Sequence, residues 1–250
     1  MNKPKVIVSL TTHSVRTKSV GRVINKILNS TFKDLKVVLT LYKDDIPLLA
    51  DDVKFLIEDK TIDFIEANED LGPHLKYFYA MQKYRDLPVI TIDDDILYPD
   101  TMVEELYNAY LKYKCVTAQK CFEILHTENG ELVYNFPMWC NYITRRNYPT
   151  HEIFATGVGG ILYPPDCFKL SNDNIPEILD SKFDDDFYLK ALEIRNDIKV
   201  FATKHNYNEL YDTVLDDPET QSIALWNSNI NNSTNSIKKF NNEFLKAITK

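Results

Sequence analysis

The 250-residue sequence has few glycines and few cysteines, and their positions exclude several common kinds of site. None of the 6 glycines forms a G-x-G-x-x-G turn or a P-loop, and the first apolar segment is followed by Thr-Thr-His-Ser-Val-Arg. A Rossmann dehydrogenase and a P-loop NTPase are therefore excluded. The 4 cysteines form no C-x-x-C pair, and no histidine cluster completes a zinc site. We therefore expect Cys115, Cys121, Cys140 and Cys167 to be free thiols in a reducing compartment.

Long apolar runs and a secretory signal are also missing. No run approaches the roughly 20 apolar residues that a membrane-spanning helix needs. The first five residues lead into a short strand-like segment rather than a signal peptide. We expect a cytoplasmic protein, either soluble or peripheral to the inner face of a membrane.

Positive charge is outnumbered by negative charge overall but is locally concentrated. The formal net charge is −8 and the pI about 5.2, so the phosphates of a nucleic acid would repel the chain. Residues 1–36 nevertheless contain eight lysines and arginines against one acid, Asp34. This pattern predicts an anionic partner for the N-terminal region, either a diphosphate or a membrane surface, although a solvated helix face would look the same.

Apolar patterning in the first 113 residues alternates between short runs and helical periodicity. In residues 18–30, apolar side chains recur at helical spacing and form one stripe. Pro47 is expected to open the next helix, and Thr101 with Glu104 to form a capping box. Such alternation predicts a right-handed, mostly parallel α/β sheet flanked by helices. The expected strands are 6–10, 36–42, 62–65 and 88–92, and the expected helices are 18–30, 47–57, 73–84 and 101–113.

The second half has a different pattern. Asn129-Gly130 is a strong hairpin turn signal, and residues 135–155 are expected to be a long functional loop. Without a linker or repeat, the chain is expected to be a single domain, with a nucleotide-sugar-binding half (1–98) and an acceptor-side half (99–250). Residues 157–163 are expected to lead into a strand, and the remaining expected elements are a strand at 198–202 and helices at 184–196, 218–227 and 236–248.

Three adjacent carboxylates, Asp93, Asp94 and Asp95, directly follow an apolar run. In an open α/β sheet, ligands bind beyond the carboxyl ends of the strands. A divalent cation needs oxygen ligands, and a diphosphate needs a cation to offset its charge. We therefore expect Asp93 and Asp95 to contact donor ribose and Mn²⁺ or Mg²⁺, with Asp95 the stronger metal candidate. An acidic surface turn is the alternative interpretation.

A second acidic cluster, Asp184-Asp185-Asp186, begins a predicted helix. Carboxylates at a helix N-terminus are favoured by the helix dipole, so one of them is explained as a cap. Sugar transfer also needs a base for the acceptor hydroxyl, and a carboxylate at this position suits that role.

Taken together, these motifs resemble bacterial GT-A glycosyltransferases related to family 2, of the type found in capsule and lipopolysaccharide biosynthesis. The likeness spans roughly residues 6–230, and the order and spacing of its motifs agree. The stretches that carry it are 8–13 with Arg16, 70–73 with Lys76, 92–99 (the DXD segment), 156–165 (a glycine-containing loop) and 185–190 (the acidic motif).

The resemblance implies transfer of a sugar, with inversion, from a nucleotide-sugar donor such as a UDP-sugar to a hydroxyl of a glycan or lipid-linked acceptor. It implies that Asp185 or Asp186 is the catalytic base and that His205 is a possible third metal ligand. Trp139 is a possible platform for a sugar face, although a core tryptophan is equally expected. The implied donor-binding residues are Thr11, Thr12, Arg16, Asp70, Lys76, Asp93 and Asp94, and the implied acceptor-side glycines are Gly157, Gly159 and Gly160.

Other functions remain open from the sequence. A nucleotidyltransferase would also combine an α/β fold with acidic metal ligands, but its usual Gly-rich basic N-terminal signature is absent. A HAD-type phosphatase would have its Asp-x-Asp near the N-terminus, and Asp93 comes too late. A carbohydrate-binding or nucleotide-sugar-binding protein without turnover is the alternative from another class.

Overall fold

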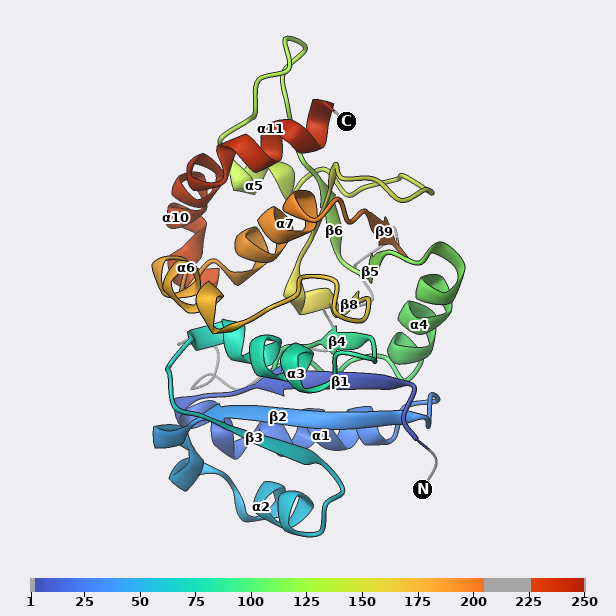
Figure 1. Ribbon diagram of the computed structural model, residues 1–250, viewed down its shortest axis with the longest axis vertical. Helices are drawn as coiled ribbons and strands as arrows, with labels where there is room; N and C mark the ends of the chain where they lie inside the picture. Colours follow the sequence, from blue (N-terminus) through green and yellow to red (C-terminus); the bar gives the residue numbers. More distant parts are fainter. Residues whose placement is uncertain (1–2, 205–225, 250) are drawn as a thin grey trace.

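The computed structural model describes residues 3–204 and 226–249 and has one seven-stranded sheet as its centre (Figure 1). The strand order is β3-β2-β1-β4-β8-β5-β9, and every neighbouring pair is parallel except the two pairs made by β8. The predicted mixed α/β fold, a single domain with a mostly parallel central sheet, is confirmed. The antiparallel β8 was not expected from the helix–strand alternation.

The first four strands alternate with helices as the hydrophobic pattern predicts. Each parallel connection needs a crossover, and a helical segment supplies it. The elements are β1 (Val6–Thr11), η1 (Ser14–Lys18), α1 (Val20–Leu28), β2 (Leu35–Tyr42), η2 (Lys43–Leu48), α2 (Asp51–Glu58), β3 (Asp63–Ala67), η3 (Gly72–Lys76), α3 (Phe78–Lys83), β4 (Val89–Thr91) and α4 (Met102–Tyr113).

The second half completes the sheet and adds a small hairpin sheet and a helical cover. α10 and α11 lie beside α5 and α7 at the end of the molecule away from β3 (Figure 1). The elements are β5 (Val116–Ala118), β6 (Cys121–Glu123), α5 (Phe136–Trp139), β7 (Ile153–Ala155), η4 (Gly157–Gly159), β8 (Ile161–Tyr163), η5 (Asn172–Asn174), α6 (Ile175–Asp180), α7 (Asp185–Arg195), β9 (Val200–Ala202), α10 (Trp226–Lys239) and α11 (Asn241–Thr249).

Two apolar clusters cover the two faces of the sheet. On β1, Val6, Val8 and Leu10 pack against α1, α2 and α4, whereas Ile7 faces the cluster formed with α3, α7 and α11. Alternate side chains of a strand point to opposite faces, so a strand buried on both sides reads as a continuous apolar run. This burial explains why the short runs identified the strands.

Several sequence-based boundaries are wrong. Pro47 lies inside η2 rather than at the start of α2. Thr101 makes no side-chain cap, because its hydroxyl donates to Glu105 while Glu104 accepts a hydrogen bond from Thr31. Residues 135–155 are not one long loop, since they contain α5 and β7. The helix expected at 218–227 falls mostly outside the described residues, and α10 begins only at Trp226.

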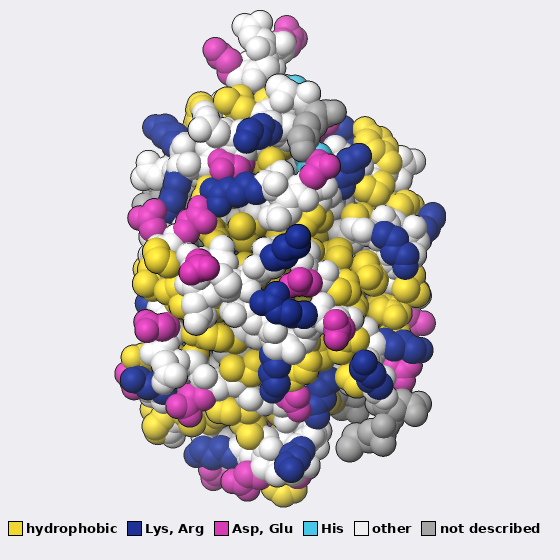
Figure 2. All heavy atoms as spheres, in the orientation of Figure 1, with side chains coloured by type: hydrophobic (Ala, Val, Ile, Leu, Met, Phe, Trp, Pro, Cys, Tyr) yellow, Lys and Arg dark blue, Asp and Glu magenta, His cyan; other side chains and the backbone are white. Residues whose placement is uncertain are grey.

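The basic N-terminal segment is partly neutralised, by its own Asp34 and by two acids from later in the chain. Lys5, Lys26 and Lys36 pair with Asp34, Asp100 and Asp63, at 2.7, 2.6 and 3.1 Å. On the face drawn in Figure 2, Lys and Arg side chains are interspersed with Asp and Glu. Across residues 3–204 and 226–249, no helix is long and apolar enough to cross a membrane.

Candidate functional site

The carboxyl ends of β1 and β4 lie side by side and bring two predicted motifs together. Ser9 pairs with Thr91, and the Ile92 N–H donates to the Ser9 carbonyl at 3.1 Å. Thr11 ends β1, so the chain after it runs beside the acidic triplet. The β4 strand thus delivers Asp93 to the edge of the sheet where α/β enzymes bind ligands.

Thr12 and Arg16 bind the acidic triplet directly. The Thr12 hydroxyl donates to Asp94 Oδ2 at 2.5 Å, and Arg16 donates to Asp94 Oδ1 at 2.8 Å. A second Arg16 nitrogen lies 3.0 Å from Asp95 Oδ2. Burial opposes the charge of Arg16, but Asp94 and Asp95 outweigh it and raise the arginine's pKa. The buried Asp94 therefore anchors the loop, and Arg16 contacts both Asp94 and Asp95.

Lys76 connects the two acidic clusters. Its side chain is 7% exposed, and its Nζ lies 3.0 Å from Asp93 Oδ1 and 2.8 Å from Asp185 Oδ2. Burial lowers the tendency of Lys76 to be charged, but the carboxylates outweigh it and hold its pKa well above the ordinary value. The triplet after β4 and the start of α7, 92 residues apart in number, are therefore parts of one site.

The two carboxylates of α7 differ in protonation. Burial opposes ionisation of Asp185, but the charge of Lys76 outweighs it and lowers the pKa of that carboxyl. Burial, and next the charge of Asp185, raises the pKa of Asp186 to about 8. Asp186 accepts a hydrogen bond from the Gly157 N–H at 2.9 Å. At neutral pH one acid is ionised and its neighbour is mostly protonated, as in sites where two adjacent carboxyls share a task.

Gly157 belongs to the centre of the site. A Cβ at this position would lie 2.6 Å from Lys76 Nζ, 3.3 Å from Asp186 Oδ1 and 3.5 Å from Asp93 Oδ1. Only glycine leaves room for this convergence. A Cβ on Gly159 would instead meet the Lys120 backbone at 2.5 Å, and Gly160 has φ +79° beside Met102. These two glycines shape the turn into β8.

Three functional neighbours were missed by the sequence reading. The His74 Nε2 faces the Ser181 carbonyl at 3.0 Å, and its Nδ1 faces the Tyr77 hydroxyl at 2.5 Å. Because a carbonyl only accepts, Nε2 carries the proton and Nδ1 accepts from Tyr77. Burial lowers the pKa of His74 and keeps it neutral. The Tyr98 hydroxyl accepts from the Asp93 N–H at 2.9 Å and so orients that residue. No motif pattern marks such buried partners.

The remaining predicted site residues lie elsewhere. Trp139 as a sugar platform is wrong, because the indole is 0% exposed, donates to the Val133 carbonyl and packs against Phe154 and Phe244. Asp70 is exposed and pairs with Lys182 at 2.6 Å, beside rather than within the carboxylate centre. His205 lies outside the described residues.

The charge of the site bears on metal binding. Counted as formal charges, the carboxylates Asp93, Asp94, Asp95 and Asp185 outnumber the cations Arg16 and Lys76 by four to two. No group of three or more His, Cys, Asp or Glu side chains within the described ranges could hold a metal ion. Mg²⁺ commonly uses one or two carboxylates and completes its shell with substrate phosphates. The donor chemistry of Asp93 and Asp95 fits that arrangement.

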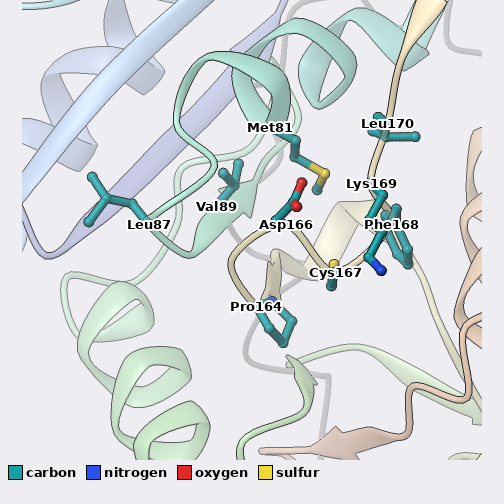
Figure 3. Close-up of a pocket in the computed structure, with 9 residues that line it drawn as sticks. All are labelled: Met81, Leu87, Val89, Pro164, Asp166, Cys167, Phe168, Lys169 and Leu170. Atoms are coloured by element: carbon teal, nitrogen blue, oxygen red, sulfur yellow. The ribbon is translucent and has the colours of Figure 1, made fainter.

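A small pocket lies at the opposite end of β4. Its walls include Met81, Val89 and Cys167 (Figure 3), and its volume of about 10 Å³ has room for one water molecule. Val89 begins β4 whereas Asp93 follows its end, so this pocket is not part of the acidic site.

Comparison with known proteins identifies the fold. The chain has 12% identity and a TM-score of 0.53 with a 4-diphosphocytidyl-2C-methyl-D-erythritol synthase from Anaerococcus prevotii, covering 94% of this chain and 97% of that one. It has 13% identity and a TM-score of 0.50 with the mannosyltransferase PcManGT from Pyrobaculum calidifontis, whose structure contains GDP-mannose and Mn²⁺. That match covers 81% of this chain and 55% of the other. The fold is GT-A-like. No family model and no curated protein matches the sequence.

Proposed function

We propose that this protein is a metal-dependent glycosyltransferase that transfers a sugar from a UDP-linked donor to a hydroxyl of a glycan or lipid-linked acceptor. The observation that carries the proposal is the Lys76 bridge between Asp93 and Asp185. It brings two acidic motifs, for which we propose donor-side and acceptor-side roles, around one buried cation. A binding protein has no need for a second acidic cluster in which one carboxyl, Asp185, is ionised and its neighbour, Asp186, is protonated. A group transfer, in contrast, needs a proton acceptor.

The donor-side roles follow from charge. Asp95 and Asp93 would hold Mn²⁺ or Mg²⁺, which offsets diphosphate charge when bound. Arg16 and Lys76 add two fixed positive charges beside the position of the phosphates. Thr11 ends the strand that would meet the nucleoside and Thr12 follows it, and Asp94 holds the loop in place through Thr12 and Arg16. The GDP-mannose and Mn²⁺ of the structural neighbour support this kind of donor.

The acceptor-side role belongs to the pair Asp185 and Asp186. Asp185 is the ionised member and is the proposed general base, and Asp186 holds the Gly157 loop against it. Strongly coupled carboxyls titrate as a pair, so both substitutions are needed to assign the base. We expect Asp185→Asn to reduce turnover by about 10²–10⁴-fold with near-normal UDP binding. If Asp186→Asn alone loses turnover, the base is Asp186, and if both retain it, this cluster is a helix start only.

The products separate the proposal from its two alternatives. A glycosyltransferase releases UDP from a UDP-sugar, whereas a nucleotidyltransferase releases pyrophosphate from UTP and a sugar phosphate. The erythritol synthase neighbour makes a diphosphocytidyl compound, so the fold leaves both reactions open. We expect Mn²⁺-dependent release of UDP and no pyrophosphate. Pyrophosphate release would establish the nucleotidyltransferase, and binding without turnover would establish a binding protein.

The same proposal includes the cellular compartment of the protein and the roles of the two halves of its chain. The 4 cysteines are all free, which supports a reducing compartment such as the cytoplasm. We propose that residues 1–98 form the donor half and 99–250 the acceptor half. Lys18 and Arg22 form no ion pair with an acidic side chain in the described part of the chain, and we propose that they supply the charge for any contact with anionic lipid.

A further inference from the structure

Two segments that are far apart in the sequence pack against each other beside the acidic centre. Residues 70–76 contain η3, and residues 181–185 lead from α6 into α7. We call the contact between these two segments the seam. At one end of the seam, Lys76 pairs with Asp185 at 2.8 Å. Whatever fixes the two segments against each other therefore also fixes this pair.

The far end of the seam is closed by Lys182. Its Nζ pairs with Asp70 at 2.6 Å, and Asp70 also accepts a hydrogen bond from the Gly72 N–H at 3.0 Å. A Cβ added at Gly72 would lie 3.2 Å from the Lys182 carbonyl oxygen, so the two backbones approach closely. The side chain of Asp70 is 50% exposed, however, and exposed ion pairs contribute little stability. This end does not hold the seam by itself.

His74 holds the middle of the seam. Its side chain is 0% exposed, and its Nε2 donates to the Ser181 carbonyl at 3.0 Å. The same carbonyl accepts from the Asp184 N–H at 2.8 Å. The imidazole also packs edge-on against Tyr77 of its own segment and Tyr188 of α7, with ring centroids 5.6 and 5.5 Å away. A buried hydrogen bond of this kind favours one arrangement of the elements that it joins.

We infer that His74 is a positioning residue that keeps Lys76 in contact with both acidic clusters, and the role of Lys76 toward a donor diphosphate rests on the proposed function. The hydrogen bond to Ser181 crosses the seam two residues before Lys76 and four residues before Asp185. Without it, η3 and the start of α7 separate, and Lys76 no longer contacts Asp93 and Asp185 together. His74 touches no reacting group, so its effect on the site passes through Lys76.

Two amide variants of His74 separate its two ring nitrogens. In His74→Gln the amide nitrogen reaches the position of Nε2 and can donate to the Ser181 carbonyl, whereas the shorter amide in His74→Asn reaches only the position of Nδ1. The readout is the ¹H–¹⁵N NMR signal of the Lys76 ammonium group in ligand-free protein, assigned by its loss in Lys76→Arg. A buried, paired ammonium group exchanges its protons slowly, so wild type and His74→Gln should show this signal. His74→Asn should lose it.

Calorimetric titration of UDP with Mn²⁺ measures the consequence for the proposed donor site. His74→Asn should weaken UDP binding by roughly threefold to tenfold, the fold-change that corresponds to one hydrogen bond, and His74→Gln should restore it. His151→Asn is the matched control, because His151 is 3% exposed and its Nε2 contacts Asp197, beyond the end of α7 opposite to Asp185. This control should keep both the Lys76 signal and the UDP affinity, whatever it does to the temperature of thermal unfolding.

The outcomes separate the inference from the proposed function. An unchanged Lys76 signal in His74→Asn overturns the inference, as does an equal loss in His74→Gln, or a wild type without the signal. If thermal unfolding shows that His74→Asn is not folded, His74→Phe, which keeps an aromatic ring without the two nitrogens, replaces it in the comparison. If wild type shows the Lys76 signal but does not bind UDP, the proposed function fails, and the signals still decide the role of His74.

Discussion

Replacing Lys76 with Met is expected to destabilise the protein strongly at neutral pH. The substitution keeps much of the side-chain volume but leaves Asp93 and Asp185 without their shared cation. Asp93 is 29% exposed and keeps contact with water, whereas Asp185 is 12% exposed and bears most of the cost. Removing one partner of a buried pair costs about 3–5 kcal/mol, and the exposure of Asp93 places our expectation near the lower value.

The pH dependence of this loss follows from the sign of the Asp185 shift. In wild type the pKa of Asp185 is lowered, so the stability from this pair is present above the unfolded pKa of about 3.9 and disappears as pH falls through the folded value. Without Lys76, burial raises that pKa and the carboxyl takes up a proton on folding. The difference between wild type and variant should therefore shrink below neutral pH, by up to about 1.4 kcal/mol per unit.

Urea denaturation at pH 7 and pH 4.5 measures both effects. Lys54→Met is the control, because Lys54 pairs with the fully exposed Asp51 and should cost less than about 1 kcal/mol. If Lys76→Met is no more destabilising than Lys54→Met at pH 7, or if its cost does not fall at pH 4.5, the bridge does not have the energetic role described.

Three further predictions concern other parts of the site. The pKa of Asp186 is raised to about 8, so the folded protein holds a proton that the unfolded chain releases above about pH 4. The free energy of unfolding of wild type should therefore decrease as pH rises from about 4 to about 8. Asp186→Asn should remove this decrease in urea titrations at pH 5, 6.5 and 8. Gly157→Ala should displace Lys76 and weaken UDP binding, measured by calorimetry, at least tenfold. Gly130→Ala is the control: its φ of +79° should cost about 1–2 kcal/mol of stability. UDP binding should stay intact in this control, because no atom lies within 4 Å of a Cβ added at Gly130. In flotation assays, anionic vesicles should bind the protein at low salt only, because each available basic residue adds about 1 kcal/mol of electrostatic attraction to the lipid surface and salt screens that attraction. If the protein does not float with the vesicles at any salt concentration, the proposed membrane contact is wrong.

The sequence predicted the first half of the fold well because β1, β2 and β4 are largely buried on both faces. Short runs such as the one in β1 are apolar apart from the buried Ser9, and helical stripes such as that of α1 separate these runs. The antiparallel β8 could not be foreseen, since its three residues are as apolar as any parallel strand. A local hydrophobic pattern indicates which strands are buried, but it does not indicate whether a strand runs parallel or antiparallel to its neighbours.

The acidic motifs of the site were predicted from the sequence, but the side-chain contacts that join these motifs were not. Adjacent carboxylates after a strand and at a helix start are visible in a sequence, and both proved to surround Lys76. The pairing of Arg16 with Asp94 and the burial of Trp139 depend on long-range packing. The Asp186 shift likewise needs the positions of Asp185 and its surroundings, which no local pattern contains.

Calorimetric titration of UDP, with Mn²⁺ and with a chelator, tests the central claim most directly. The account predicts that wild type binds UDP at least tenfold more tightly with Mn²⁺, because the site carries a net negative charge that a divalent cation must offset. Asp95→Ala should lose most of that difference and remain folded. Equal affinity with and without metal would contradict the metal role, and the absence of UDP binding under either condition would contradict a nucleotide-sugar site at Lys76.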